Sequence, residues 1–223
     1  MPRRRPLRPL LAAAAASLVL AGCGSTFPGE AVVVGDTRLS MDRFSALADA
    51  GCTYLATAAA VQGGQAPGQG AVRQVIATQQ LQLAGAEKVA ADRGIEVAPS
   101  EYELRPADLQ QLEELIGDDQ LDDIVEILER DFKSQALRTA IGADETGTTP
   151  TQENAEQLLA DGSAVVTDEL VRLDAAVDPR FGIDIEGQPD PGLQLSVARE
   201  QLEEVDPATL PAAQQCRGVE SSE

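Results

Sequence analysis

The chain has 223 residues, of which 37 are acidic, 17 are basic and none is histidine, and its formal net charge is −20. A chain this acidic repels nucleic acid and anionic lipid headgroups, so we expect neither as a partner. Without imidazole, Ser-His-Asp and Cys-His catalytic arrangements and histidine-based zinc sites are excluded.

The first 23 residues carry a pattern typical of export. Four arginines lie within MPRRRPLRPL, and residues 10–20 (LLAAAAASLVL) form an apolar run. As a helix this run would be about 17 Å long, too short for the roughly 30 Å core of a bilayer. It therefore predicts a signal peptide rather than a transmembrane helix.

The apolar run ends in Leu20-Ala21-Gly22-Cys23, which resembles the lipobox of bacterial lipoproteins. The resemblance implies that the Cys23 sulfur receives a diacylglyceryl group and that cleavage leaves Cys23 as the first residue. We therefore expect a signal peptide over residues 1–22 and a protein held by its lipid at the extracytoplasmic face of the bacterial cell membrane. The alternative is an ordinary secretory signal with an incidental cysteine.

Cleavage before Cys23 changes the charge and leaves one predicted domain. Four of the 17 basic residues lie in the signal peptide, so 13 remain against 37 acidic residues, a net charge of −24. Residues 23–30 are predicted to be a tether, and residues 31–223 a single domain. Possible sub-lobes are 31–98 plus 178–223, and 99–177.

Apolar residues that recur at three and four positions predict a mainly α protein. The predicted helices span residues 41–61, 71–93, 119–141 and 150–177. Another helix is predicted to start at the capping-box spacing of residues 100–103, and Pro106 either limits it to a fragment or opens the next helix, which reaches about residue 116. Their ends are set by caps and breakers, namely Ser40, Gly94, Gly142, Pro179 and the capping-box spacing at residues 149–152. Gly162 is expected to weaken the last helix.

Two short β elements are predicted. AVVVGDTRLS (31–40) has a β-branched run and a Gly-Asp turn, which together indicate a small N-terminal hairpin. Residues 178–197 alternate Phe181, Ile183 and Ile185, and then Leu193, Leu195 and Val197, around Gly-Pro turns. This second pattern predicts a short C-terminal two-stranded element.

No segment has the frame of a catalytic or metal site, although carboxylate pairs, Ser-Lys dyads and acidic metal sites remain formally possible. DDQLDD (118–123) lacks the ligand spacing and central Gly of a calcium loop. VQGGQAPGQG (61–70) follows a predicted helix rather than a strand, so it is a linker and not a phosphate-binding loop. We predict no catalytic residue, no metal site, no cofactor and no enzymatic activity.

Cys52 and Cys216 are the thiols that remain once Cys23 is acylated. Outside the cytoplasm an even pair usually forms a disulfide, so we predict a bridge that pins the C-terminal tail to the first helix. Closing a loop of about 165 residues stabilises by up to about 5 kcal/mol on the chain-entropy model. The alternative is a buried free Cys52 and a dangling Cys216.

The order of these elements resembles the SurA-like N-terminal chaperone domain. In that family an A-x-V-N-G-x-x-I-T entry leads into a helical core, and Val34-Gly35-Asp36-Thr37-Arg38-Leu39-Ser40 stands in its place, with valine for asparagine. Asp178-Pro179-Arg180-Phe181-Gly182 resembles the N-P-R-[FY]-G turn of actinobacterial lipoproteins that carry this domain. The resemblance covers most of residues 30–200.

The resemblance implies the chaperone part of a SurA- or PrsA-type protein without the parvulin isomerase domain. The expected partners are unfolded secreted polypeptides and, through Cys23, the membrane. No client-binding residue and no oligomeric state is predicted, and Arg180 is expected to pair with a carboxylate and hold its turn. The alternative function is a helical scaffold or adaptor lipoprotein of a cell-envelope complex.

Overall fold

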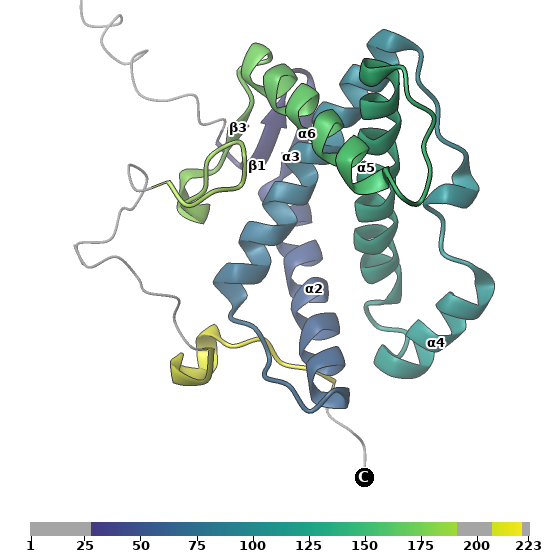
Figure 1. Cartoon of the computed structure of the whole chain (residues 1–223). Helices are drawn as coiled ribbons and strands as arrows, with labels where there is room; N and C mark the ends of the chain where they lie inside the picture. Colours follow the sequence, from purple (N-terminus) through teal and green to yellow (C-terminus); the bar gives the residue numbers. More distant parts are fainter. Residues whose placement is uncertain (1–27, 191–206, 220–223) are drawn as a thin grey trace, which may run out of the picture.

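The computed structural model describes residues 28–190 and 207–219, and this part of the chain is mainly helical (Figure 1). Its α-helices are α2 (Met41–Val61), α3 (Gln69–Arg93), α4 (Pro106–Ile116), α5 (Leu121–Thr146) and α6 (Ala155–Arg172). Short 3-10 helices lie at Pro99–Glu101, Pro179–Phe181, Pro207–Thr209 and Ala212–Gln214. The predicted lipidation site Cys23 lies outside the described residues.

A three-stranded antiparallel sheet lies beside α3 (Figure 1). β1 (Glu30–Val34) and β2 (Thr37–Ser40) form the predicted hairpin, which is confirmed. Gly35 has a φ of +56° at the turn, a conformation that glycine adopts without a steric cost. β3 (Ala176–Val177) pairs with the other edge of β1, so the strand order is β2-β1-β3.

The start of α2 is fixed by local chemistry, as the sequence predicts. Ser40 has an extended backbone, and its side chain accepts a hydrogen bond from the Arg43 amide at 3.2 Å. This bond satisfies one of the amide groups that the first helical turn leaves without a partner. The predicted range 41–61 is confirmed.

The predicted end of the fourth helix at Gly142 is wrong, because α5 continues to Thr146. Gly142 faces Gly162 of α6 where the two helices cross. A Cβ atom added to Gly142 would lie 2.0 Å from the Leu158 carbonyl oxygen, and one added to Gly162 would lie 1.8 Å from the Arg138 carbonyl oxygen. Both glycines therefore allow close packing of helix backbones, and neither is a breaker.

The predicted last helix, 150–177, is too long at both ends. At its start Asn154 accepts a hydrogen bond from the Thr151 amide at 2.7 Å, and residues 151–154 form a turn before α6 begins at Ala155. At its end α6 stops at Arg172, the chain turns at Asp174 with a φ of +50°, and Ala176–Val177 then pair with β1 as strand β3.

The first strand of the predicted C-terminal two-stranded element does not form in the described residues. Ile183 and Pro189 form an isolated antiparallel bridge, while Phe181 lies in a 3-10 helix. The second predicted strand, with Leu193, Leu195 and Val197, lies outside the described residues.

The core lies where α2, α3 and α5 pack together beneath α6 and the sheet. The fully buried side chains at its centre include Phe44, Leu47, Leu81, Ile141 and Leu170. Of the described helices, α2 has the length and mean hydropathy needed to cross a membrane. However, 44% of its most apolar window is buried inside the protein, and α2 packs against α3 and α5 as a core helix.

Candidate functional site

A hollow of about 910 Å³ opens between the C-terminal half of α2, the C-terminal end of α4 and the segment 216–219, and we call it the α2–α4 groove. Its volume lies in the upper part of the range of ligand sites. Its main apolar lining residues are Ala56, Ala60, Val61, Leu115, Ile116 and Val219.

Small side chains on α2 leave this space open. Ala56 and Ala60 are one helical turn apart, so their methyl groups lie on one face of α2, toward α4. At the mouth of the groove the apolar side chains are exposed to solvent, 72% for Val61 and 44% for Val219. A concave surface with exposed apolar residues is typical of a site for an apolar ligand or polypeptide.

The C-terminal wall of the groove is attached to α2 by a disulfide. Cys52 and Cys216 are bonded, with their Cα atoms 4.9 Å apart, so the predicted bridge is confirmed. The Cys216 amide also donates to the Pro67 carbonyl at 3.0 Å, and the Val219 amide donates to the Thr57 hydroxyl at 3.1 Å. The disulfide therefore positions one side of the hollow.

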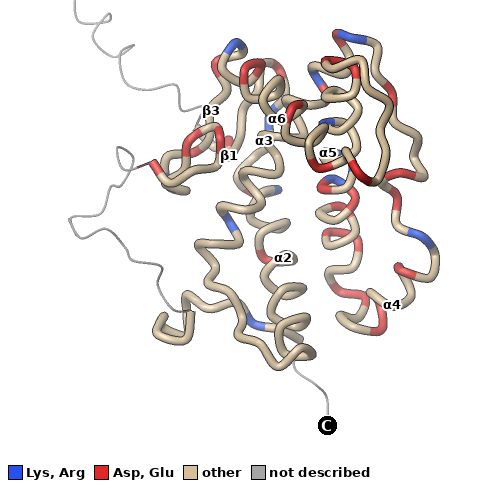
Figure 2. Tube along the Cα trace, viewed as in Figure 1, with Lys and Arg blue, Asp and Glu red and all other residues tan. Residues whose placement is uncertain are grey.

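Acidic residues flank the groove on the α4 side. Residues 106–129 contain nine Asp or Glu and no Lys or Arg, and this charge lies along α4 and the start of α5 (Figure 2). Glu114 is part of the lining, and Asp118 and Asp119 follow the lining residue Gly117. All three carboxylates are exposed, and within residues 28–190 and 207–219 none of the three forms an ion pair.

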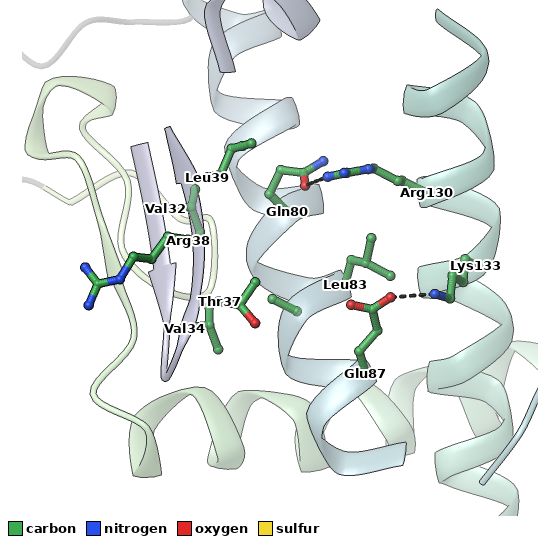
Figure 3. A pocket seen from close by; sticks show the side chains of 11 residues that line it. Val32, Val34, Thr37, Arg38, Leu39, Gln80, Leu83, Glu87, Arg130 and Lys133 are labelled. Carbon is green, nitrogen blue, oxygen red and sulfur yellow. Dashed lines mark hydrogen bonds and ion pairs between the residues drawn. The ribbon is translucent and has the colours of Figure 1, made fainter. Parts of the chain in front are cut away.

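A second hollow, of about 300 Å³, lies between the hairpin, α3 and α5 (Figure 3). We call it the hairpin pocket. Apolar side chains from β1, β2 and α3 form one side, including Val34, Leu39 and Leu83. On the other side, Arg130 and Lys133 reach from α5 toward α3 (Figure 3).

Two cations of the hairpin pocket, Arg130 and Lys133, are neutralised by the protein itself. Arg130 donates to the side-chain oxygen of Gln80 and forms an ion pair with Glu126 at 2.7 Å. Lys133 forms an ion pair with Glu87 at 2.5 Å, shown in Figure 3. Because Arg130 and Lys133 already have partners, an anion that binds in the hairpin pocket would have to displace a carboxylate. We therefore take the α2–α4 groove as the candidate site.

The turn that carries the family resemblance has a structural role. The Arg180 guanidinium forms two hydrogen bonds to the Asp178 carboxylate, at 2.9 and 2.7 Å, and they hold the pKa of Asp178 below its usual value. The Asp178 amide donates to the Ala31 carbonyl, and the Phe181 ring lies 4.4 Å from the Phe44 ring. The expected pairing of Arg180 with a carboxylate is confirmed.

The acidic run 118–123 leads into α5, as predicted, with Asp122 and Asp123 in its first turn. Over the described ranges, no group of three Cys, Asp or Glu side chains could hold a metal ion.

The sequence did not identify the groove residues. Val61 is the last residue of α2 and Val219 follows the disulfide, so periodicity places neither of them in a site. The signal that could have found them is the run of small residues at 56–60 of an otherwise apolar helix, which implies unfilled space on one face.

Comparison with known proteins gives no relative. No family model, no curated protein and no solved structure matches the chain. The SurA-like resemblance therefore stays a prediction.

Proposed function

We propose that this protein is a lipid-anchored lipoprotein at the extracytoplasmic face of the cell membrane that binds unfolded polypeptides without catalysing a reaction. The observation that supports binding most directly is the α2–α4 groove, an open hollow of about 910 Å³ with exposed apolar side chains at its mouth. The lipobox-like sequence ending at Cys23 supports the location.

The groove suits a protein that binds polypeptides weakly and with little sequence selectivity. Covering apolar surface gains about 25 cal/mol per Å², but ordering an unfolded segment costs much of this free energy, so we expect affinities in the micromolar range. The short side chains of Ala56 and Ala60 impose little shape on a ligand. Such a surface accepts many apolar sequences.

The attachment of the tether supports the same function. The Met41 amide donates to the Gly29 carbonyl at 2.7 Å, so the tether enters at the N-terminal end of α2. The groove lies along the other end of this 21-residue helix, from Ala56 to Val61, about 22–30 Å away. From Cys23 to Pro28 the chain spans at most about 18 Å. A lipid at Cys23 would therefore hold the pole opposite to the groove, leaving the groove open to secreted chains.

The test uses the protein that starts at Gly24, which contains all the described residues. We expect it to suppress aggregation of a chemically denatured test protein at near-stoichiometric ratios. Val61→Gln should weaken this effect, because Val61 is an exposed apolar residue of the groove. The matched control is Val171→Gln, which changes a valine of similar exposure, 62%, near the end of α6 and outside the groove.

Two results would contradict the proposal. Equal loss of activity in Val61→Gln and Val171→Gln would mean that the groove is not the binding surface. Unaltered aggregation, together with specific retention of one folded envelope protein, would replace the chaperone function with that of an adaptor.

A further inference from the structure

We infer that the α2–α4 groove selects apolar polypeptide segments that are flanked by lysine or arginine. This inference rests on the proposed function of the same groove and adds the class of segment that it prefers.

The apolar part of the ligand follows from the lining. Glu114 is the charged residue among those that line the groove. The other lining residues are apolar or small, apart from Thr57 and the disulfide-bonded Cys216. Ala56 and Ile116 are 4% and 5% exposed and form its base, while Val61 and Val219 are exposed at its mouth. An inserted segment therefore contacts apolar atoms inside the groove and carboxylates at its edge.

The basic part of the ligand follows from the charges at that edge. Glu114 lines the groove, and Asp118 and Asp119 lie directly after Gly117, where the lining ends. We call these three residues the acidic rim. Some of the other carboxylates in this region are already used by the protein, since Asp108 pairs with Arg105 and Asp123 with Arg43. The acidic rim has no such partner among the described residues, so its charge is available to a ligand.

The basic residues near the groove do not cancel the rim. Arg43 lies in the first turn of α2, at the end away from the groove, and is bound to Asp123 at 2.6 Å and also to Glu126. Arg217 stands between the lining residues Cys216 and Gly218, is exposed, and is not itself part of the lining. The local balance at the mouth of the groove is therefore negative, and a cationic flank is complementary to it.

The size of the preference can be worked from the rim. An exposed ion pair changes an equilibrium by a factor of about two, and Arg217 offsets one of the three rim carboxylates, so the remaining two give roughly a fourfold preference for a basic flank over a neutral one. An acidic flank would be repelled and bind more weakly still. Salt should remove the preference, because the screening length falls from about 30 Å at 0.01 M to about 3 Å at 1 M.

The test compares two fluorescent peptides with the same apolar core, one flanked by lysines and one by glutamates. Their dissociation constants for the protein starting at Gly24 are measured by anisotropy at about 0.01 M and about 1 M salt. We expect the lysine-flanked peptide to bind at least fourfold more tightly at low salt and about equally at high salt. The variant E114Q/D118N/D119N should lose most of the low-salt preference.

The control variant separates the rim from the overall charge. E96Q/E103Q/E153Q removes the same charge from three exposed carboxylates that do not line the groove, and it should keep the preference. Equal binding of both peptides to the wild type at low salt, or an equal loss of preference in both triple variants, would overturn the inference. If neither peptide binds and aggregation is not suppressed, the proposed function itself fails.

Discussion

A methyl group added at Gly142 tests the crossing of α5 and α6. In Gly142→Ala the new Cβ would lie 2.0 Å from the Leu158 carbonyl oxygen, whereas ordinary van der Waals contact begins near 3.4 Å. The obstacle is backbone and not a flexible side chain, so a rotamer change cannot relieve it. The two helices must therefore move apart by more than 1 Å.

The expected loss follows from two opposing effects. Overpacking a tight interface costs up to about 3 kcal/mol. Replacing glycine by alanine in a helix interior stabilises the helix by about 1 kcal/mol. We therefore expect the free energy of unfolding to fall by about 2 kcal/mol. For a chain of about 200 residues this lowers the melting temperature by about 4–8 °C.

The assay is thermal unfolding of the protein starting at Gly24, followed by circular dichroism with the disulfide intact. The matched control is Gly70→Ala in α3, where an added Cβ meets no atom within 4 Å. The control should unfold at the wild-type temperature or slightly above it, because alanine favours the helix. If Gly142→Ala is as stable as the control, the close packing of α5 and α6 is refuted.

Three further predictions concern covalent and ionic links. Cys52→Ser is expected to lower the free energy of unfolding by up to about 5 kcal/mol on the chain-entropy model. In the wild-type protein, thiol labelling after unfolding without reduction should find neither Cys52 nor Cys216 free, and reaction of both would contradict the bridge. The lowered pKa of Asp178 means that its bond to Arg180 stabilises the fold above the unfolded-state pKa of about 3.9, and that this contribution is lost as the pH falls through the folded-state pKa. Arg180→Gln should therefore be less stable than the wild type at neutral pH in urea unfolding, and a difference that persists unchanged in strong acid would count against this linkage. Membrane-extracted protein should have the intact mass of residues 23–223 plus a diacylglyceryl group, and Cys23→Ala should leave the membrane fraction; undiminished membrane association would disprove the anchor.

The sequence alone determined the elements whose signals are local. The first helix, α2, has the predicted bounds because the Ser40 side chain and the amide it caps are three residues apart. The hairpin has the predicted turn because Gly35 supplies a left-handed conformation between two β-branched or polar runs. The disulfide was also predictable, because the pairing of Cys52 with Cys216 follows once Cys23 is assigned to the lipid.

The tertiary structure alone decided the features in which distant segments meet. Gly142 has the same local preference as any helix-ending glycine, and only its contact with α6 keeps it inside α5. Val177 lies at the end of a helical pattern but becomes a strand because Val32 offers it backbone partners. The α2–α4 groove is the strongest case. Its space exists only because α2, α4 and the C-terminal segment approach without filling the gap beside Ala60, and no local pattern encodes a distance between three separate segments.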